Sequence, residues 1–246
     1  MSPAPGSPHP PLSKGLIPPF GWGLYGSGDL RRGTHPRNQT KFSAHRPNQF
    51  RPAEGIKGYR RLVPSRVAVV GCSGSGKTTV ARRVADRLGL EHVELDALAH
   101  QPGWTMRPAE EFRSDLERRL SGAKQGWVTC GHYRRMVGDM HLDQADTIVW
   151  LDLPRRTVMT RVIRRTIRRV LTREELWNGN REPWTNLYHW DPERNVIKWS
   201  WVTYKDRRDL YEQCMSDGSW VHANTIHLRS QRAIDGFLES LPGSVK

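Results

Sequence analysis

Residues 66–90 read RVAVVGCSGSGKTTVARRVADRLGL and join a short apolar run, a glycine loop and a helix-forming segment. The run at 67–70 suits a strand buried on both faces of a parallel sheet, and the apolar positions 80, 84 and 88 repeat at helical spacing. Gly71, Gly76, Lys77 and Thr78 match the pattern GxxxxGK[ST], in which backbone amides surround phosphates, the lysine reaches the β- and γ-phosphates and the hydroxyl reaches Mg²⁺. We predict a phosphate-binding loop, the alternative being a glycine turn with Lys77 in solvent. The residues expected to contact the phosphates are Gly71, Ser73, Gly74, Ser75, Gly76, Lys77, Thr78 and Thr79.

Composition and charge limit the class of protein. The 246 residues carry a net charge of +14, and residues 1–61 hold ten lysines and arginines against only Asp29 and Glu54. The three cysteines are far apart and form no CxxC pair, which indicates neither a disulfide framework nor a zinc site. No apolar run approaches the ~18 residues of a membrane span, and the N-terminus lacks the apolar core of a signal peptide. We therefore expect a soluble, cytoplasmic monomer with no membrane partner.

Residues 1–62 differ in composition from the rest of the chain. They contain ten of the seventeen prolines and show neither a helical nor a strand period. Such a segment buries too little apolar surface to offset the entropy lost on ordering. We predict a disordered, basic, Pro/Gly-rich extension at 1–62 and one P-loop domain at 63–246. The extension is either inert, which we favour, or a basic arm for nucleic acid.

A second strand is predicted at 92–96, HVELD, and Asp96 stands at its end. Ligands bind at the carboxyl edge of open α/β sheets, so Asp96 should lie near the phosphates. A carboxylate there can hold a Mg²⁺-bound water or accept a proton from an attacking hydroxyl. We predict that Thr78 and Asp96 bind the metal and that Asp96 is also catalytic. The alternative for Asp96 is a helix N-cap, since a helical turn starts at Ala97.

Two later strands, at 126–130 and 147–152, place further polar residues at the same edge. The loop after the first contains Arg134 and Arg135, which either grip an anionic acceptor or form an exposed basic turn. Asp152 ends the second, and four apolar residues followed by aspartate resemble the metal-binding Walker B pattern. A fifth strand is expected at 225–228.

The segment 155–173 contains eight arginines and no acid. As a helix, it would place arginines on one face and an apolar row on the opposite face. Like charges at this spacing oppose helix formation, so the arginine face makes most sense against phosphates, where guanidinium groups can neutralise a transferring phosphoryl group. The alternative is a solvated charged face. The predicted arginine face is Arg161, Arg164, Arg165 and Arg168, and the predicted apolar row is Met159, Ile163, Ile167 and Val170.

The arginine helix and the aperiodic segment 174–192 together form a predicted lid at about 155–192. Residues 174–192 contain three tryptophans and two prolines. This composition predicts a flap that seals the site from water, the alternative being a segment that its aromatic side chains pin to the core. A long helix is expected at about 193–215, with Trp201, Tyr211 and Met215 on its buried stripe. Arg208 interrupts that stripe and either reaches solvent or meets an anion.

With these motifs together, the chain resembles the adenylate-kinase-like P-loop kinases, and among them the bacterial proteins called DNA topology modulation proteins. The resemblance covers residues 63–241 and rests on GCSGSGKTT (71–79), ELDALAHQPGW (94–104), WVTCGHY (127–133), TIVWLDLP (147–154) and RRTIRRVLTREELWNGNRE (164–182). It implies a five-stranded parallel sheet of order 2-3-1-4-5, ATP as donor and a closing lid. Thr129 and Cys130 stand where the family pattern has an aspartate, and the loop reads GHY rather than GNY, which puts more weight on Asp96.

The sequence thus predicts a three-layer α/β P-loop fold with an arginine-rich helical lid. It predicts an ATP- and Mg²⁺-dependent phosphotransferase acting on a nucleotide or another small hydroxyl or phosphate acceptor. One alternative is a nucleic-acid-associated ATPase or a nucleotide-binding module acting on DNA, and another is a P-loop protein that binds nucleotide without turnover. The predicted catalytic residues are Lys77, Asp96, Arg161, Arg165 and Arg168.

Overall fold

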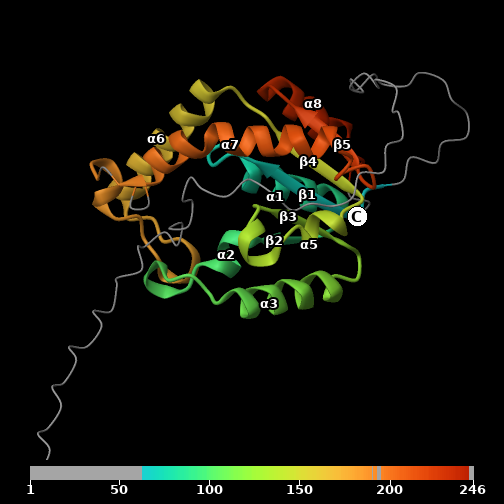
Figure 1. Cartoon of the computed structure of the whole chain (residues 1–246), viewed down its shortest axis with the longest axis horizontal. Coiled ribbons are helices and arrows are strands. Elements are labelled where there is room, and N and C mark those ends of the chain that lie inside the picture. Colours follow the sequence, from blue (N-terminus) through green and yellow to red (C-terminus); the bar gives the residue numbers. More distant parts are fainter. Residues whose placement is uncertain (1–62, 190, 193–194, 244–246) are drawn as a thin grey trace, which may run out of the picture.

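The computed structural model describes residues 63–189, 191–192 and 195–243, which form a five-stranded parallel sheet with helices on both faces (Figure 1). The strand order β2-β3-β1-β4-β5 confirms the predicted order. The predicted disorder of 1–62 lies outside the described residues. The strands are β1 (Arg66–Gly71), β2 (Glu91–Glu94), β3 (Trp127–Cys130), β4 (Thr147–Leu151) and β5 (Asn224–Leu228).

The central strand β1 separates two apolar cores because its side chains alternate between the faces of the sheet. Val67 and Val69 belong to one core, and Ala68 and Val70 belong to the other. Each neighbouring strand runs parallel to β1, with Val67 opposite Val128 of β3. The carboxyl ends of the strands therefore meet at one edge, where β1 leads into the glycine loop.

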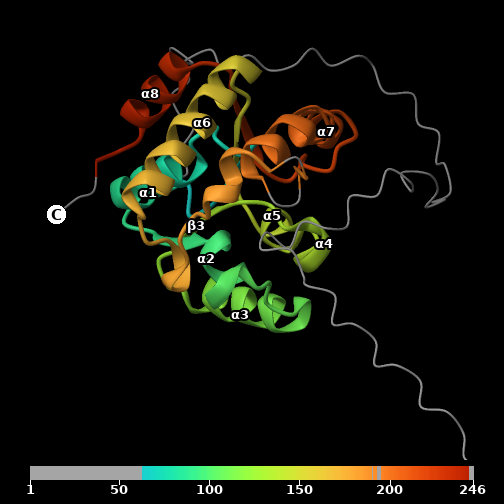
Figure 2. The same ribbon diagram turned by 90° about the vertical axis from the view of Figure 1, so that its left-hand side faces the viewer.

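Two groups of helices cover the sheet (Figure 2). Side chains of α1, α8 and the first half of α6 pack with Val67 and Val69, and side chains of α3, α4, α5 and the second half of α7 pack with Ala68 and Val70. The longer helices are α1 (Lys77–Leu88), α3 (Ala109–Gly122), α6 (Arg155–Thr172), α7 (Val196–Ser216) and α8 (Gln231–Ser240). The short ones are α2 (Leu95–Ala99), η1 (Pro102–Trp104), α4 (Arg134–Val137), α5 (Met140–Asp143), η2 (Trp177–Gly179) and η3 (Trp184–Leu187).

The lid helix α6 buries only half of the predicted apolar row. Met159 and Val170 are buried as predicted. Ile163 and Ile167 were expected inside but are 37% and 41% exposed, and Val158 and Val162 are buried instead. The reason is close contact with the glycine loop, since a Cβ atom on Gly74 would lie 2.4 Å from Cγ2 of Val162. Packing against the loop, rather than the best apolar row of the helix alone, sets its rotation.

The buried stripe predicted for α7 is also partly wrong. Trp201 is 52% exposed and Met215 lies at the surface, whereas Trp199 is buried. Tyr211 is buried as expected. The buried side changes along α7, because Ile197 and Tyr204 of its first half pack against the core that contains Val67 and Val69. Tyr211 of its second half packs in the core that contains Ala68 and Val70.

Within the part of the chain that the structure describes, no helix combines the length and the apolar character needed to cross a bilayer.

Candidate active site

The glycine loop between β1 and α1 has a backbone that side chains would block. Gly71, Gly74 and Gly76 have φ values of 147°, 83° and 97°, a region that favours glycine. A Cβ atom on Gly71 would lie 2.7 Å from the carbonyl oxygen of Leu151. The loop therefore packs tightly against the end of β4 while its amides and the start of α1 remain directed to one concave region.

Lys77 is the first residue of α1, and its side chain folds over the loop. Its Nζ donates a hydrogen bond to the carbonyl oxygen of Cys72 at 2.9 Å. Burial lowers the pKa of Lys77, and the nearby Asp96 carboxylate opposes that change. The Lys77 side chain is thus held against the backbone of the loop.

A cavity of about 900 Å³ opens over the loop, and we call it the P-loop groove. Arginines of α6 form its opposite wall. Arg161 bridges the two sides, because its Nη1 donates to the carbonyl oxygen of Ser75 at 3.3 Å and its Nη2 donates to Oε1 of Gln231 at 2.7 Å. The groove is lined by residues 73–80, Arg82, Arg83, Glu94, Asp96, Arg161, Arg165, Arg168, Arg169, 174–177, Gln231, Ile234 and Leu238.

The arginines that α6 directs to the groove form an i, i+4, i+8 row: Arg161, Arg165 and Arg169. Burial and the charge of Arg169 both lower the pKa of Arg165, and among the described residues no hydrogen-bond partner faces its buried Nε. Arg168 also lines the groove but is exposed and pairs with Glu174 at 2.9 Å. The predicted arginine face therefore differs from the observed one. It included Arg164, which is exposed and does not line the groove, and it omitted Arg169, which does.

A smaller cavity of about 80 Å³ adjoins the groove, and we call it the aromatic pocket. It is walled by four aromatic rings and by charged groups, including Arg207 from α7. Lys77 and Asp96 line both cavities, so they stand where the two meet. The pocket is lined by Ser73, Lys77, Asp96, His100, Trp104, Gly131, His132, Tyr133, Arg165, Arg169, Trp177, Glu182, Val196, Trp199 and Arg207.

Asp96 lies in the first turn of α2 rather than at the end of a strand, because β2 stops at Glu94. The hydroxyl of Tyr133 donates to Oδ1 of Asp96 at 2.5 Å and lies 3.4 Å from Nε2 of His100. Burial and the Asp96 charge raise the pKa of Tyr133, so the phenol keeps its proton and acts as donor. Burial lowers the pKa of His100, which keeps that ring neutral. Asp96 is thus oriented by neutral partners.

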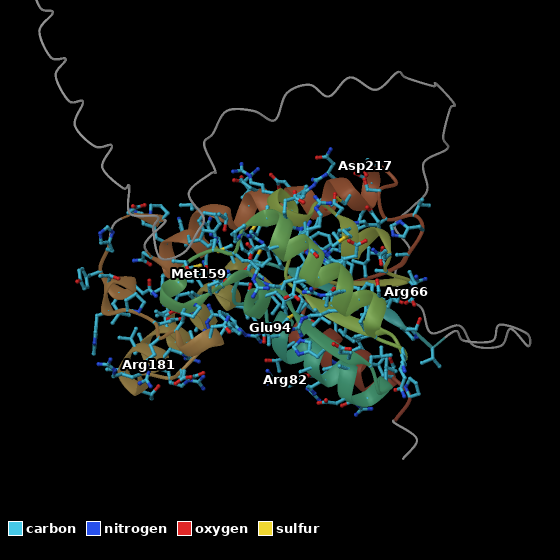
Figure 3. The ribbon with its side chains drawn as sticks, turned by 90° about the horizontal axis from the view of Figure 1, so that it is seen from below. Arg66, Arg82, Glu94, Met159, Arg181 and Asp217 are labelled. Carbon is cyan, nitrogen blue, oxygen red and sulfur yellow. The ribbon has the colours of Figure 1, made fainter. Side chains whose placement is uncertain are left out.

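Oxygen atoms suited to a hard cation gather beside the loop. Oγ1 of Thr78 donates to Oε1 of Glu94 at 3.0 Å, and Glu94 and Asp96 line the same groove. Figure 3 shows Glu94 between Arg181 of the lid and Arg66 at the start of β1. The described residues contain no group of three His, Cys, Asp or Glu side chains placed to hold a metal. The oxygens of Thr78 and Glu94 are ligands of the type that Mg²⁺ prefers, because this ion takes one or two protein oxygens and completes its shell with phosphate oxygens and water.

Asp152 and Arg208, both open questions from the sequence, pair with each other. Nε of Arg208 lies 3.0 Å from Oδ1 of Asp152, and Nε2 of His227 lies 2.9 Å from Oδ2. Asp152 thus joins β4, β5 and α7, while Asp96 lines both cavities. Arg134 pairs with Asp139 at 3.1 Å and is exposed, as an exposed basic turn would be.

The segment 174–189 is fastened to the loop at 100–106. Oδ1 of Asn180 accepts from the Trp104 backbone N–H at 2.9 Å, and its Nδ2 donates to the carbonyl oxygens of Gln101 and Trp177 at 2.9 and 2.8 Å. Trp104 Nε1 donates to the Arg181 carbonyl oxygen at 3.0 Å. The flap is thus pinned largely by asparagine side chains, with Trp177 over both cavities.

Several residues at the site were not selected from the sequence. The i, i+4 spacing of the α6 arginines could have identified Arg169. The others come from separate segments that only the fold brings together, and no local pattern marks them. These are His100, Tyr133, Glu182 and Arg207. Trp177 belongs to the predicted sealing segment 174–192 and lines both cavities.

Comparison with known proteins agrees with this geometry. Residues 67–175 match a family model described as an AAA domain. A cytidylate kinase of Pyrococcus furiosus is 31% identical over 141 residues, a match that covers 50% of this chain and 70% of that protein. The chain belongs to the adenylate-kinase-like P-loop kinases. The predicted link to DNA topology modulation proteins is tested by none of these matches.

Other matches to this P-loop kinase cover less or are more distant. A cytidylate kinase of Thermosipho africanus is 38% identical over 80 residues, which cover 31% of this chain and 36% of that relative, so the chain spans about a third of the relative's length. The shikimate kinase of Acinetobacter baumannii, solved in complex with shikimate, has a TM-score of 0.41 and 19% identity, with 72% of this chain and 90% of that one covered.

Proposed function

We propose that this P-loop kinase transfers the γ-phosphoryl group of ATP to a small hydroxyl or phosphate acceptor in a Mg²⁺-dependent reaction. The observation that carries the proposal is the junction of two cavities at Lys77 and Asp96, with the half-buried Arg165 beside them. ATP would lie in the P-loop groove and the acceptor in the aromatic pocket. The transferring group would then pass between them.

The glycine loop would hold the donor through backbone amides. Residues 71–79 supply those amides, Lys77 would neutralise charge on the β- and γ-phosphates, and Arg161 and Arg165 would face the same group from the lid. Arg165 is half-buried, and its Nε lacks a hydrogen-bond partner among the described residues, which supports a phosphate ligand for this guanidinium. Arg168 would join them through the adjacent wall of the groove.

Thr78 and Asp96 are the proposed metal-binding residues, with Glu94 as an added candidate from its 3.0 Å contact with Thr78. When bound, Mg²⁺ supplies charge neutralisation on the phosphate oxygens. Asp96 would accept the proton of the attacking hydroxyl, and Tyr133 would keep that carboxylate oriented. Trp177 and the fastened flap would keep water from the transferring group.

The acceptor proposal has a direct test. Two relatives are named cytidylate kinase, which makes cytidine monophosphate the first nucleotide to examine. ADP release would be coupled to a spectroscopic readout with ATP, Mg²⁺ and a panel of nucleosides, nucleoside monophosphates and small alcohols. Acceptor-dependent ADP release that EDTA abolishes is the expected result. ATP binding without transfer to any acceptor would instead favour a nucleotide-binding protein without turnover.

Nucleic-acid binding is the less favoured alternative. Its strongest support in the sequence was the arginine helix, but four arginines of that helix line the P-loop groove, which leaves fewer for a polynucleotide backbone. It requires affinity for DNA or RNA that falls steeply with salt. A filter-binding titration at two salt concentrations separates the two functions. A cytoplasmic monomer remains our expectation.

A further inference from the structure

The aromatic pocket is lined by more cations than acids. Its cations are Lys77, Arg165, Arg169 and Arg207, and its acids are Asp96 and Glu182. Arg169 pairs with Glu182, with Nη1 to Oε1 at 3.2 Å. Lys77 and Arg165 also line the P-loop groove, where the donor phosphates would use their charge. Arg207 is then the cation that an acceptor with its own negative charge would meet in this pocket.

Arg207 differs from the other cations because it lines the aromatic pocket and not the P-loop groove. Lys77, Arg165 and Arg169 line both. Lys77, Asp96 and Arg207 line the aromatic pocket together, so the Arg207 guanidinium belongs to the acceptor side of the junction. Arg207 is therefore positioned for the acceptor, and a guanidinium binds a carboxylate or a phosphate with paired hydrogen bonds.

The pocket is too small for a nucleotide. At about 80 Å³ it has room for on the order of six water-sized groups, against roughly 300–1,000 Å³ for sites that take drug-sized ligands. The wall formed by Trp104 and Trp177 is held in place by its contacts. Trp104 is hydrogen-bonded to Asn180 and Arg181, and its ring meets that of Trp177 edge-on, with 6.3 Å between the centroids. A base, a ribose and a phosphate exceed that space.

We propose that the acceptor is a small hydroxy acid whose acid group binds Arg207 and whose hydroxyl faces Asp96, with its carbon skeleton against the tryptophan rings. This inference rests on the proposed kinase function and names its substrate class. Much of the pocket wall, including Trp177, Trp199 and Arg207, lies after residue 175, where the match to the AAA domain model ends. The family match to residues 67–175 therefore does not extend to that part of the acceptor site.

The reaction balances without further reactants. The acceptor hydroxyl oxygen forms a bond to the γ-phosphorus of ATP while the bond from that phosphorus to the β,γ-bridging oxygen breaks. ADP leaves with the bridging oxygen, and the hydroxyl proton passes to Asp96 and then to water. The products are the phosphate ester of the acid, ADP and one proton.

The test measures binding and transfer separately. Tryptophan fluorescence would follow titration of the full chain, with Mg²⁺ and a non-hydrolysable ATP analogue, by D-glycerate, L-malate, L-tartrate, glycerol 3-phosphate, glycerol and cytidine monophosphate. Transfer from ATP to each would be measured by ADP release and product mass. We expect saturable binding and phosphorylation of at least one of the four acids, with glycerol and cytidine monophosphate at least tenfold weaker. Comparing the three carboxylates with glycerol 3-phosphate distinguishes the two kinds of acid group.

Variants on one helix make the assignment specific. Arg207→Met should weaken binding of the acid roughly 10- to 100-fold and leave binding of glycerol unchanged, because only a charge-assisted hydrogen bond is lost. Arg207→Lys should bind the acid with an affinity between those of the wild type and Arg207→Met. Lys205→Met is the control, because it removes a cation from the same helix whose side chain is 80% exposed. It should leave binding of the acid and of glycerol unchanged. Far-ultraviolet circular dichroism and the melting temperature check folding.

Other outcomes separate this inference from the kinase proposal. Phosphorylation of cytidine monophosphate but of none of the four acids would overturn the hydroxy-acid inference and leave the kinase function intact. Acid binding that depends on Arg207, with no transfer to any acceptor, would support the pocket assignment and overturn the kinase function. Absence of saturable binding by all four acids would overturn the inference.

Discussion

The P-loop groove and the aromatic pocket share Lys77 and Asp96 but are assembled in different ways. One wall of the groove comes from consecutive residues, 73–80, and uses backbone groups whose direction depends on the glycine φ values. The aromatic pocket draws side chains from separate parts of the chain, between residues 73 and 207. The comparison teaches that a backbone site can be identified from a local motif, whereas a site made of converging side chains cannot.

The difference also has a functional meaning. A backbone cradle recognises any triphosphate, because phosphate oxygens are common to all of them. The aromatic pocket presents particular shapes and charges, and these select one acceptor. Changes to the groove should therefore affect every substrate pair, and changes to the pocket should affect the acceptor alone.

The largest effect on turnover is expected at Lys77, which lines both the P-loop groove and the aromatic pocket. Lys77→Ala should lower kcat about 100- to 1,000-fold for every acceptor, because it removes a charge that faces the transferring group. The coupled ADP assay measures this, and the melting temperature should stay close to that of the wild type. Arg113→Ala, a loss of one exposed cation on α3, is the matched control. Unchanged turnover in a folded Lys77→Ala protein would remove the P-loop from the mechanism.

The next effect compares two neighbouring lid arginines. Arg165→Met should lower kcat/KM for ATP roughly 10- to 100-fold, because a half-buried guanidinium facing phosphate is lost. Arg164→Met, one residue earlier and exposed, should lower it less than about twofold. Steady-state kinetics with varied ATP give both values. Equal losses would contradict the inward row of Arg161, Arg165 and Arg169.

A stability effect is expected at the ends of β4 and β5. Burial raises the pKa of Asp152, but hydrogen bonds from His227 and Arg208 outweigh it, so the pKa lies below the ordinary value of 3.8. A carboxyl with a lowered pKa stabilises the fold at neutral pH and loses that contribution as the pH falls through the folded-state value. Asp152→Asn should cost about 1–3 kcal/mol of unfolding free energy at pH 7.

Urea unfolding at pH 7, 5 and 3 checks this prediction. The difference between wild type and Asp152→Asn should be similar at pH 7 and 5 and should shrink below pH 3.8, the ordinary aspartate value. Asp206→Asn, on the exposed side of α7, is the control and should show no such pH dependence. Because Asp152 braces the helix that carries Arg207, the acceptor KM should rise while ATP affinity stays unchanged. A constant difference from pH 7 to pH 3 would disprove the role of the carboxylate charge.

The smallest effect is expected at the flap. Asn180→Ala removes three hydrogen bonds from a buried side chain and should cost about 1–2 kcal/mol of stability. The acceptor KM should rise several-fold, with ATP affinity unchanged. Arg181→Ala is the control, because it changes a neighbouring side chain and keeps the backbone carbonyl oxygen that accepts the hydrogen bond from Trp104 Nε1. If ATP affinity falls as much as acceptor affinity, the groove and the pocket are not separable.

Much of the fold could be predicted because its signals are local. The apolar run at 67–70, the glycine loop and the i, i+4 row of α1 predicted elements that the structure contains. The strand order came from the family resemblance and is confirmed. Asp96 lines the same groove as the glycine loop, although it sits in α2 rather than at the end of a strand.

The faces of the lid helices could not be predicted, because each contains more than one plausible buried row. On α6, Ile163 and Ile167 gave the stronger apolar pattern, yet contact with Gly74 selected Val158 and Val162. That rotation turned Arg169 inward and Arg164 outward. A pattern of residues shows which rows are available, and the surface against which the helix packs selects one.

The sequence by itself determined the glycine loop between β1 and α1 and the P-loop kinase class, because the conformations that only glycine adopts readily, and the spacing of Lys77 and Thr78, are properties of adjacent residues. Tertiary structure alone decided that Arg207, Tyr133 and three tryptophans meet around Asp96, and that Asp152 braces α7. The physical reason is that side chains distant in sequence are brought together only by the packing of whole helices and strands.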